Sequence, residues 1–153
     1  NKLGHLVYFL FDQQKIALLG FDSVCAEADD SSGLSRLNEL ARNEFKDQAG
    51  FADRVRQLGP ELDYDGVFAK SLEKRPVVLG YYFTGDEDGR TTGHLPAPVI
   101  LRDAVKGRQV AAFSWTGYGA NIEVLANAAP LAGHFNPVAD TDGVIRSLPL
   151  LME

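Results

Sequence analysis

Val77-Val-Leu-Gly-Tyr-Tyr-Phe83 decides the fold, because it runs for seven residues without a charged side chain. A second run of the same kind, Ile16-Ala-Leu-Leu-Gly-Phe21, comes earlier and ends at Asp22. Continuous apolar strands are typical of parallel sheets that are covered on both faces. We therefore expect an α/β fold with a mixed, largely parallel central sheet, helices packed on it and a C-terminal β-hairpin.

Apolar residues recur at helical spacing in the segments around these strands. Side chains that can accept a hydrogen bond from a free helix amide precede three of the segments, namely Ser31 or Ser32, Asp63 or Asp65, and Asn121. Gly59-Pro60 and Pro130 are expected to end helices. The expected helices are residues 3–11, 34–45 with a stop at Gly50, 51–58, a helix that begins at Asp63 or Asp65 and finishes before Pro76, and 122–129.

Glycine and proline mark the segments that lack a periodic pattern. Gly85 to Pro98 predicts an excursion over the surface. Val110 to Trp115 resumes the strand pattern, and Gly117-Tyr118-Gly119 then predicts a tight turn. The two glycines also resemble a phosphate-binding loop, but Ile122 stands where its third glycine would be, so the pattern favours the turn.

The closing segment, Gly133 to Leu151, predicts two short strands around the turn Asp140-Thr-Asp-Gly143. Alternation along the second strand places Arg146 on the same face as the apolar Val144 and Leu148. A guanidinium on an apolar face must reach water or find a carboxylate. We expect Asp140, across the turn, to be its partner.

Composition excludes several classes of partner. The 153 residues carry a net charge of -6, and the basic residues are scattered, so we expect no nucleic-acid partner. The apolar run Leu6 to Phe11 is too short to cross a bilayer, and no signal peptide is visible. The single Cys25 excludes an internal disulfide and favours a small buried apolar side chain over a reactive thiol.

An acidic stretch follows the first expected strand and contains Asp22, Glu27 and Asp29. Ligands of open α/β sheets bind beyond the carboxyl ends of the strands, so this stretch could hold a metal or a cationic ligand. The alternative is that Asp22 bonds loop amides and the other carboxylates are solvated. No nucleophile motif or metal-ligand spacing accompanies them, so we expect no catalytic residue, no metal ligand and no cofactor.

Gly133-His-Phe-Asn-Pro-Val-Ala-Asp-Thr-Asp-Gly-Val-Ile-Arg-Ser-Leu-Pro-Leu-Leu151 resembles the ending of the CHASE type-two domains, the cyclase/histidine-kinase-associated sensory extracellular domains. Three other segments resemble the same family in the same order: Leu18-Leu-Gly-Phe-Asp22 with its acidic loop, Asp65 to Phe83, and Thr116 to Ala129. Family members usually begin with a further strand and a Trp-Pro-Trp-containing loop, so we expect that first strand to be absent from these residues.

The resemblance implies that residues 1–153 form a single extracytoplasmic sensor domain of a bacterial receptor. The receptor would be anchored in the cytoplasmic membrane by segments outside these residues, with a cyclase or kinase output and an unknown small-molecule or environmental signal. The candidate ligand-binding residues are Asp22, Glu27, Asp29, Tyr118, Asn136 and Arg146. Two other functions remain open: a dimerisation or partner-binding module, with the chain as a homodimer, and a metal-assisted hydrolase built on the acidic loop.

Overall fold

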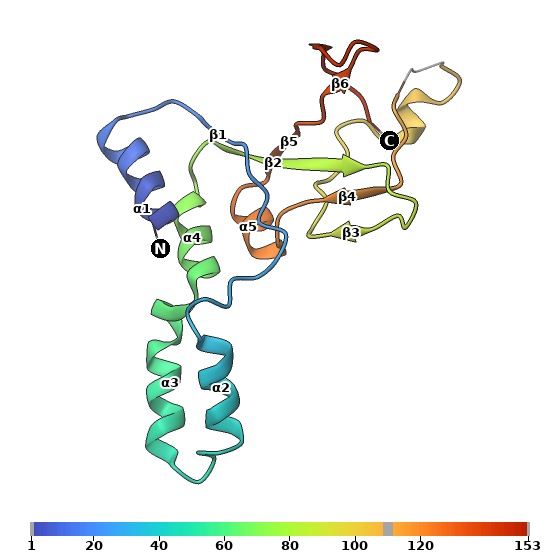
Figure 1. The fold of residues 1–153 in the computed structure, drawn as a ribbon. Coiled ribbons are helices and arrows are strands. Elements are labelled where there is room, and N and C mark those ends of the chain that lie inside the picture. Colours follow the sequence, from blue (N-terminus) through green and yellow to red (C-terminus); the bar gives the residue numbers. More distant parts are fainter. Residues whose placement is uncertain (1, 109–111, 153) are drawn as a thin grey trace.

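The computed structural model describes residues 2–108 and 112–152 as an α/β fold (Figure 1). Its helices are α1 (Lys2–Tyr8), which continues as a π-helical turn (Phe9–Gln13), α2 (Leu34–Arg42), α3 (Ala49–Leu62), α4 (Tyr64–Leu72), a 3-10 turn (Arg102–Val105) and α5 (Glu123–Ala128). Its strands are β1 (Leu19–Phe21), β2 (Val77–Thr84), β3 (Thr91–Thr92), β4 (Gly117–Gly119), β5 (Leu131–His134), β6 (Val138–Ala139) and β7 (Ile145–Ser147).

The sheet is built around β2, which pairs with three other strands. It runs parallel to β1 and to β5, with Leu79 opposite Phe21 on one side and Ala132 on the other. Its last residues pair antiparallel with β4, and β4 pairs parallel with β3. The expected mixed, largely parallel sheet and the C-terminal hairpin β6–β7 are thus confirmed.

The hydrophobic core lies between one face of this sheet and the helices α1, α4 and α5 (Figure 1). Alternation along β2 points Val77 and Leu79 into it, and both are almost fully buried. They meet Leu72 of α4 and Leu125 of α5, which the structure buries completely. The predicted apolar face of α4 therefore packs as expected, through Phe68 and Leu72. The face predicted for residues 3–11 packs only in part, because Val7 is buried while Leu3 and Leu6 are more than 40% exposed.

The opposite face of the parallel strands is not covered by a helix in the described part of the chain, so the expectation of cover on both faces is wrong. Gly20 and Gly133 are exposed there, and Leu131 is 55% exposed. The ring of Phe135 rests on Gly80, because a Cβ on that glycine would come within 2.8 Å of it. The first strand is also shorter than expected, since only Leu19–Phe21 pairs.

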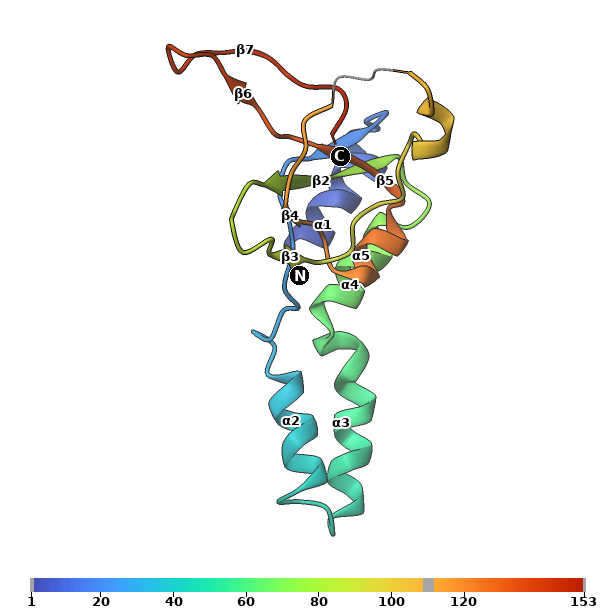
Figure 2. The ribbon, with the colours of Figure 1, turned by 90° about the vertical axis from the view of Figure 1, so that its right-hand side faces the viewer.

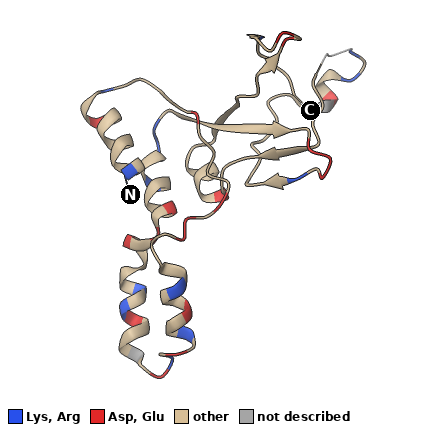
Figure 3. Ribbon diagram, viewed as in Figure 1, with Lys and Arg blue, Asp and Glu red and all other residues tan. Residues whose placement is uncertain are grey.

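α2 and α3 form an antiparallel hairpin that projects away from the sheet (Figure 2). Near the turn between the helices, Phe45 of the connecting segment packs on Phe51 of α3, with ring centroids 4.8 Å apart. Positive and negative residues alternate over its outer surface (Figure 3), and Arg36 bonds Glu39 at 2.6 Å. The projecting pair is thus held together mainly by its own contacts.

Two helix boundaries differ from the sequence expectation. α3 does not end at Gly59 but runs through Pro60 to Leu62. Pro60 has no N–H to donate, yet the helical bonding resumes after it, with the Asp63 amide bonded to the Gly59 carbonyl at 2.8 Å. Asp63 then caps α4, as predicted, and its carboxylate accepts from the Gly66 amide. At α2 the N-cap is Gly33, with φ 71°, and α2 ends at Arg42, well before Gly50.

The expected turn at Gly117-Tyr-Gly119 is wrong, because these residues form β4. The glycines serve close packing instead, since a Cβ on Gly119 would collide with the Tyr82 ring. In the expected strand Val110 to Trp115, Val110 and Ala111 lie outside the described residues, and the rest contributes an isolated bridge from Phe113 to Met152. The pairing of β5 with β2 was not predicted at all.

Candidate functional site

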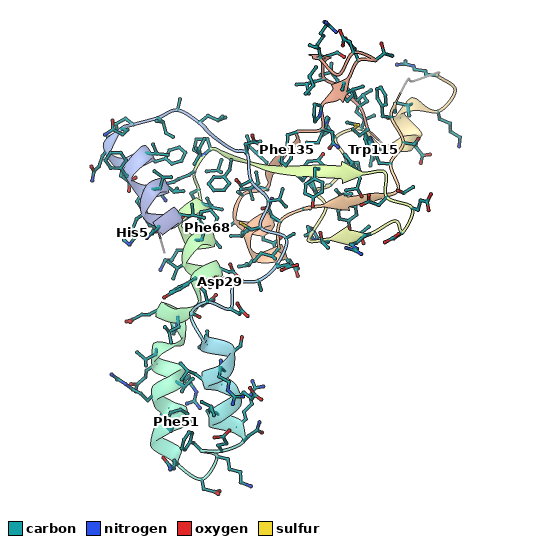
Figure 4. All side chains as sticks on the ribbon, viewed as in Figure 1. His5, Asp29, Phe51, Phe68, Trp115 and Phe135 are labelled. Atoms are coloured by element: carbon teal, nitrogen blue, oxygen red, sulfur yellow. The ribbon has the colours of Figure 1, made fainter. Side chains whose placement is uncertain are left out.

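An acidic groove of about 840 Å³ lies where the loop after β1 passes the first turn of α4. The loop supplies residues 24–31, α4 supplies Tyr64, Asp65 and Phe68, and α1 supplies Lys2 and Leu3. The carboxylates of Glu27, Asp29, Asp30 and Asp65 line this groove, and Lys2 is the cation among its lining residues. Figure 4 shows Asp29 beside α4, below Phe68. The balance of charge favours a positively charged ligand.

Hydrogen bonds hold the outer part of the loop against α4. The Asp29 amide donates to the Asp65 carboxylate at 2.8 Å. The Asp29 carboxylate in turn accepts from the Ser31 hydroxyl at 2.7 Å. The loop therefore bonds α4 through Asp29, in the middle of the acidic groove.

A single buried side chain ties the inner part of the loop to the sheet. Asn121, only 5% exposed, accepts from the Cys25 amide at 2.9 Å and donates to the Gly80 carbonyl at 2.8 Å. The backbone adds a further bond, from the Ile122 amide to the Cys25 carbonyl at 2.8 Å. The expectation that Asn121 caps a helix is wrong, because the N-cap is Ile122 and the Asn121 amide satisfies distant backbone groups instead.

The same residue also forms part of a smaller pocket, of about 200 Å³, between the sheet and α5. Tyr81 and His94 line this pocket with apolar side chains of β2, β5 and α5. The His94 amide donates to the Asn121 carbonyl at 2.7 Å. Burial raises the pKa of Tyr81 above its ordinary value, so its phenol stays protonated at neutral pH. Asn121 thus lines the smaller pocket and bonds Cys25, which lines the acidic groove.

The structure brings together only two of the six candidate residues, Glu27 and Asp29, which share the acidic groove. Asp22 is exposed just after β1, outside the groove lining. The remaining three lie elsewhere, on or beyond β4 and β5. Tyr118 of β4 is opposite Phe83, and Asn136 bonds the Phe83 backbone from the other side.

Arg146 lies on β7 and makes the contact predicted for it. Its guanidinium donates to Asp140 at 2.7 Å and also to Asp142 at 2.8 Å. The hydrogen bond from Arg146 is the main reason that the pKa of Asp142 lies below its ordinary value. The side chain is 55% exposed, so the guanidinium reaches water as well as a carboxylate. The bonds from Arg146 to Asp140 and Asp142 therefore close the turn of the hairpin.

Cys25 contacts the core from the inner end of the acidic groove and is partly buried. Burial, and then the negative charge of Asp65, raises its thiol pKa. The thiol is therefore protonated at neutral pH and a poor nucleophile. Among the described residues, no group of three or more His, Cys, Asp or Glu side chains could hold a metal ion.

Sequence reasoning missed Asp65 and Asn121, which organise the acidic groove. Both were interpreted as possible helix caps, the role that a local pattern suggests for Asp and Asn before an apolar run. No local signal could have revealed the bond from Asn121 to Cys25, because the two residues are 96 positions apart.

None of the described helices combines the length and apolar composition needed to cross a lipid bilayer. No curated protein and no solved structure matches the chain. The sequence model of the CHASE2 domain matches residues 1–153, which is the whole chain. The chain therefore belongs to the CHASE2 domain family, a family of sensory extracellular domains.

Proposed function

We propose that this chain is the signal-binding part of a bacterial receptor anchored in the cytoplasmic membrane, and that it controls a cyclase or kinase domain on the cytoplasmic side. Membership of a sensory extracellular family supports the outer location and the sensing role. A sensor must also bind its signal with different affinity in two states, so the binding region has to be coupled to the rest of the fold.

The acidic groove is the proposed binding region. Its lining contains four carboxylates and one lysine. A ligand that carries positive charge is therefore attracted and an anion is repelled. The groove is wide, and much of its lining is a loop held by hydrogen bonds rather than by a packed strand. Such a loop can rearrange around a ligand at lower cost than the core can.

The observation that carries the proposal is the position of Asn121. Its side chain joins the groove loop at Cys25 to the central strand at Gly80, and its carbonyl joins the loop at His94. A ligand that displaces the groove loop must strain or break these bonds, because buried polar groups cannot exchange them for water. Binding is thereby coupled to β2 and to the start of α5.

The test is a thermal-shift and calorimetry series with two organic cations as probes, spermidine and agmatine. A probe that binds the groove raises the melting temperature, and Asp29→Asn or Glu27→Gln weakens its binding by about 5-fold or more. Asp22→Asn is the matched control, because Asp22 is an acidic residue of the same loop outside the groove lining. Equal loss in all three variants, or binding that none of them alters, contradicts the groove as the binding region.

Coupling is tested separately in the full-length receptor by measuring its output. Asn121→Ala is expected to retain probe binding within about 3-fold while reducing the response of the output domain. An undiminished response in that variant contradicts the role of Asn121.

A partner-binding module is the second candidate function, and the uncovered sheet face favours it. No observation favours a metal-assisted hydrolase.

A further inference from the structure

Exposed apolar side chains gather in two parts of this chain and are missing from its middle. No large hydrophobic residue between positions 19 and 98 is exposed in the described part of the chain. Beyond position 98 they are frequent, and the yellow, orange and red segments that carry most of them lie above β2 in Figure 1. The most exposed of them are Val99, Leu101, Leu131, Ile145, Leu148 and Leu150.

Leu131 belongs to the uncovered face of the parallel sheet. On that face Gly80 lies opposite Gly133, and Gly20 lies opposite Val78, so three of the positions have no side chain. Phe135 covers Gly80 and is itself 38% exposed. Parallel strands are stable when both of their faces are covered. Apart from Phe135, this apolar face therefore has no packing partner among the described residues.

The hairpin β6–β7 also lacks a surface to pack against in the described residues. Every residue from Ala139 to Leu148 is exposed, and in the described residues β6 pairs only with β7. An isolated two-stranded hairpin is at best marginally stable in water and needs a further strand or a packed surface. Ile145 is 55% exposed and Leu148 is 62% exposed. The hairpin therefore presents apolar side chains that its own chain does not bury.

The charges of the hairpin do not oppose packing. Arg146 is bonded to both Asp140 and Asp142, so its guanidinium is neutralised within the hairpin. The turn retains a net charge of about one negative unit, at the end of the hairpin rather than along its strands. The strands can approach an apolar surface without leaving an unpaired guanidinium.

The accessible area is larger than that expected of a compact monomer of this mass. A folded monomer of 16.7 kDa is expected to expose about 7,600 Å², whereas this chain exposes 10884 Å². The excess is about 3,300 Å², of which the projecting α2–α3 hairpin contributes a polar share. Stable homodimers bury about 1,000–2,500 Å² on each chain, so the excess is sufficient for one.

We propose that two copies of this chain form a two-fold dimer in which the β6–β7 hairpin of each packs on the uncovered sheet face of the other. One chain carries both the uncovered face and the projecting apolar hairpin, and a two-fold exchange covers both with a single interface. An unrelated partner would have to supply both complementary surfaces. The proposal does not depend on the ligand or on the acidic groove.

Sedimentation velocity over a range of concentrations tests the dimer. The wild-type chain is expected to sediment at twice its mass of 16.7 kDa. Leu131→Glu and Leu148→Glu each place a charge in the interface and are expected to weaken association by about 10-fold or more. Both side chains are more than half exposed, so the fold of the single chain is retained. Val124→Glu is the matched control, because Val124 is 42% exposed on α5, on the covered side of the sheet.

A double variant, Gly133→Cys with Leu148→Cys, identifies the arrangement. Under oxidation it is expected to give a disulfide-linked dimer, while each single variant gives less. A wild-type chain that stays monomeric, or a dimer that neither Glu variant weakens, overturns the proposal. A cross-link that forms only within one chain also overturns it, because the hairpin then covers its own sheet.

Discussion

The side chain of Asn136 pairs with the backbone of Phe83 in both directions, accepting from its amide and donating to its carbonyl at 2.7 Å each. A strand residue would make the same two bonds. The amide of Asn136 thus continues the pairing of β2 after β5 has ended at His134. Asn136 is 8% exposed, so these bonds are largely shielded from water.

Replacing Asn136 with alanine removes both bonds and leaves the amide and carbonyl of Phe83 without them. We expect Asn136→Ala to lower the free energy of unfolding by about 2 kcal/mol, measured by urea denaturation. Asn127→Ala is the control, because Asn127 is exposed on α5. A loss below about 0.5 kcal/mol would mean that water replaces the Asn136 side chain at little cost.

The two glycines Gly50 and Gly80 should respond to alanine in opposite directions. A Cβ on Gly50 meets nothing within 4 Å, and Gly50 lies inside α3, so Gly50→Ala is expected to stabilise the chain by about 0.5 kcal/mol. A Cβ on Gly80 would lie 2.9 Å from the Phe21 carbonyl oxygen, so Gly80→Ala is expected to destabilise it. Thermal unfolding of both variants checks the contrast, and the same sign for both would contradict it.

The closing hairpin should contain one carboxyl group that titrates at unusually low pH. The pKa of Asp142 lies below 3.8, first because Arg146 donates a hydrogen bond to it and second because the Val144 amide does. Its contribution to hairpin stability is therefore present above pH 3.8 and is lost as the pH falls through the lowered pKa. Arg146→Gln should raise the pKa of Asp142, as measured by NMR titration of its carboxyl carbon.

Arg90→Gln is the control for this titration, because Arg90 pairs with Asp88 and not with the hairpin. An unchanged Asp142 pKa in Arg146→Gln would show that the backbone amide alone is responsible for the shift.

The thiol of Cys25 should react slowly with iodoacetamide at pH 7.5. Burial raises its pKa above 9.0, and the charge of Asp65 raises it further, so little thiolate is present. Asp65→Asn removes the second cause and is expected to increase the rate by about 2- to 3-fold. Asp30→Asn, in the same groove, serves as the comparison. Equal rates in Asp65→Asn and the wild type would remove Asp65 as a cause.

Features determined by neighbouring residues could be predicted from the sequence. Asp140 and Arg146 were matched across the turn, and Asp63 was matched to the helix that it caps, because each pair lies within one local element. The strand Val77 to Phe83 was also found, since its apolar run is long and unbroken. The mixed, largely parallel sheet followed from the α/β pattern, whereas the order of its strands was not predicted.

Features determined by distant contacts could not be predicted. Gly117 and Gly119 look like turn residues, yet they are required because Arg90 and Tyr82 come too close for a side chain. Asn121 looks like a helix cap, yet its partners are Cys25 and Gly80. In each case the local preference is worth about 1 kcal/mol, and long-range packing outweighs it.

The junction at Asp63 gives the projecting helix pair a mechanical property. Asp63 ends α3 and caps α4, and Asp65, two residues on, bonds the groove loop at Asp29. Fourteen residues of α3 extend from this pivot for about 21 Å, so a tilt of about 10° moves the far end by about 4 Å. If a ligand rearranges the groove loop, α2 and α3 are expected to act as a lever arm that enlarges a sub-ångström shift at Asp65 into a displacement that a neighbouring protein could detect.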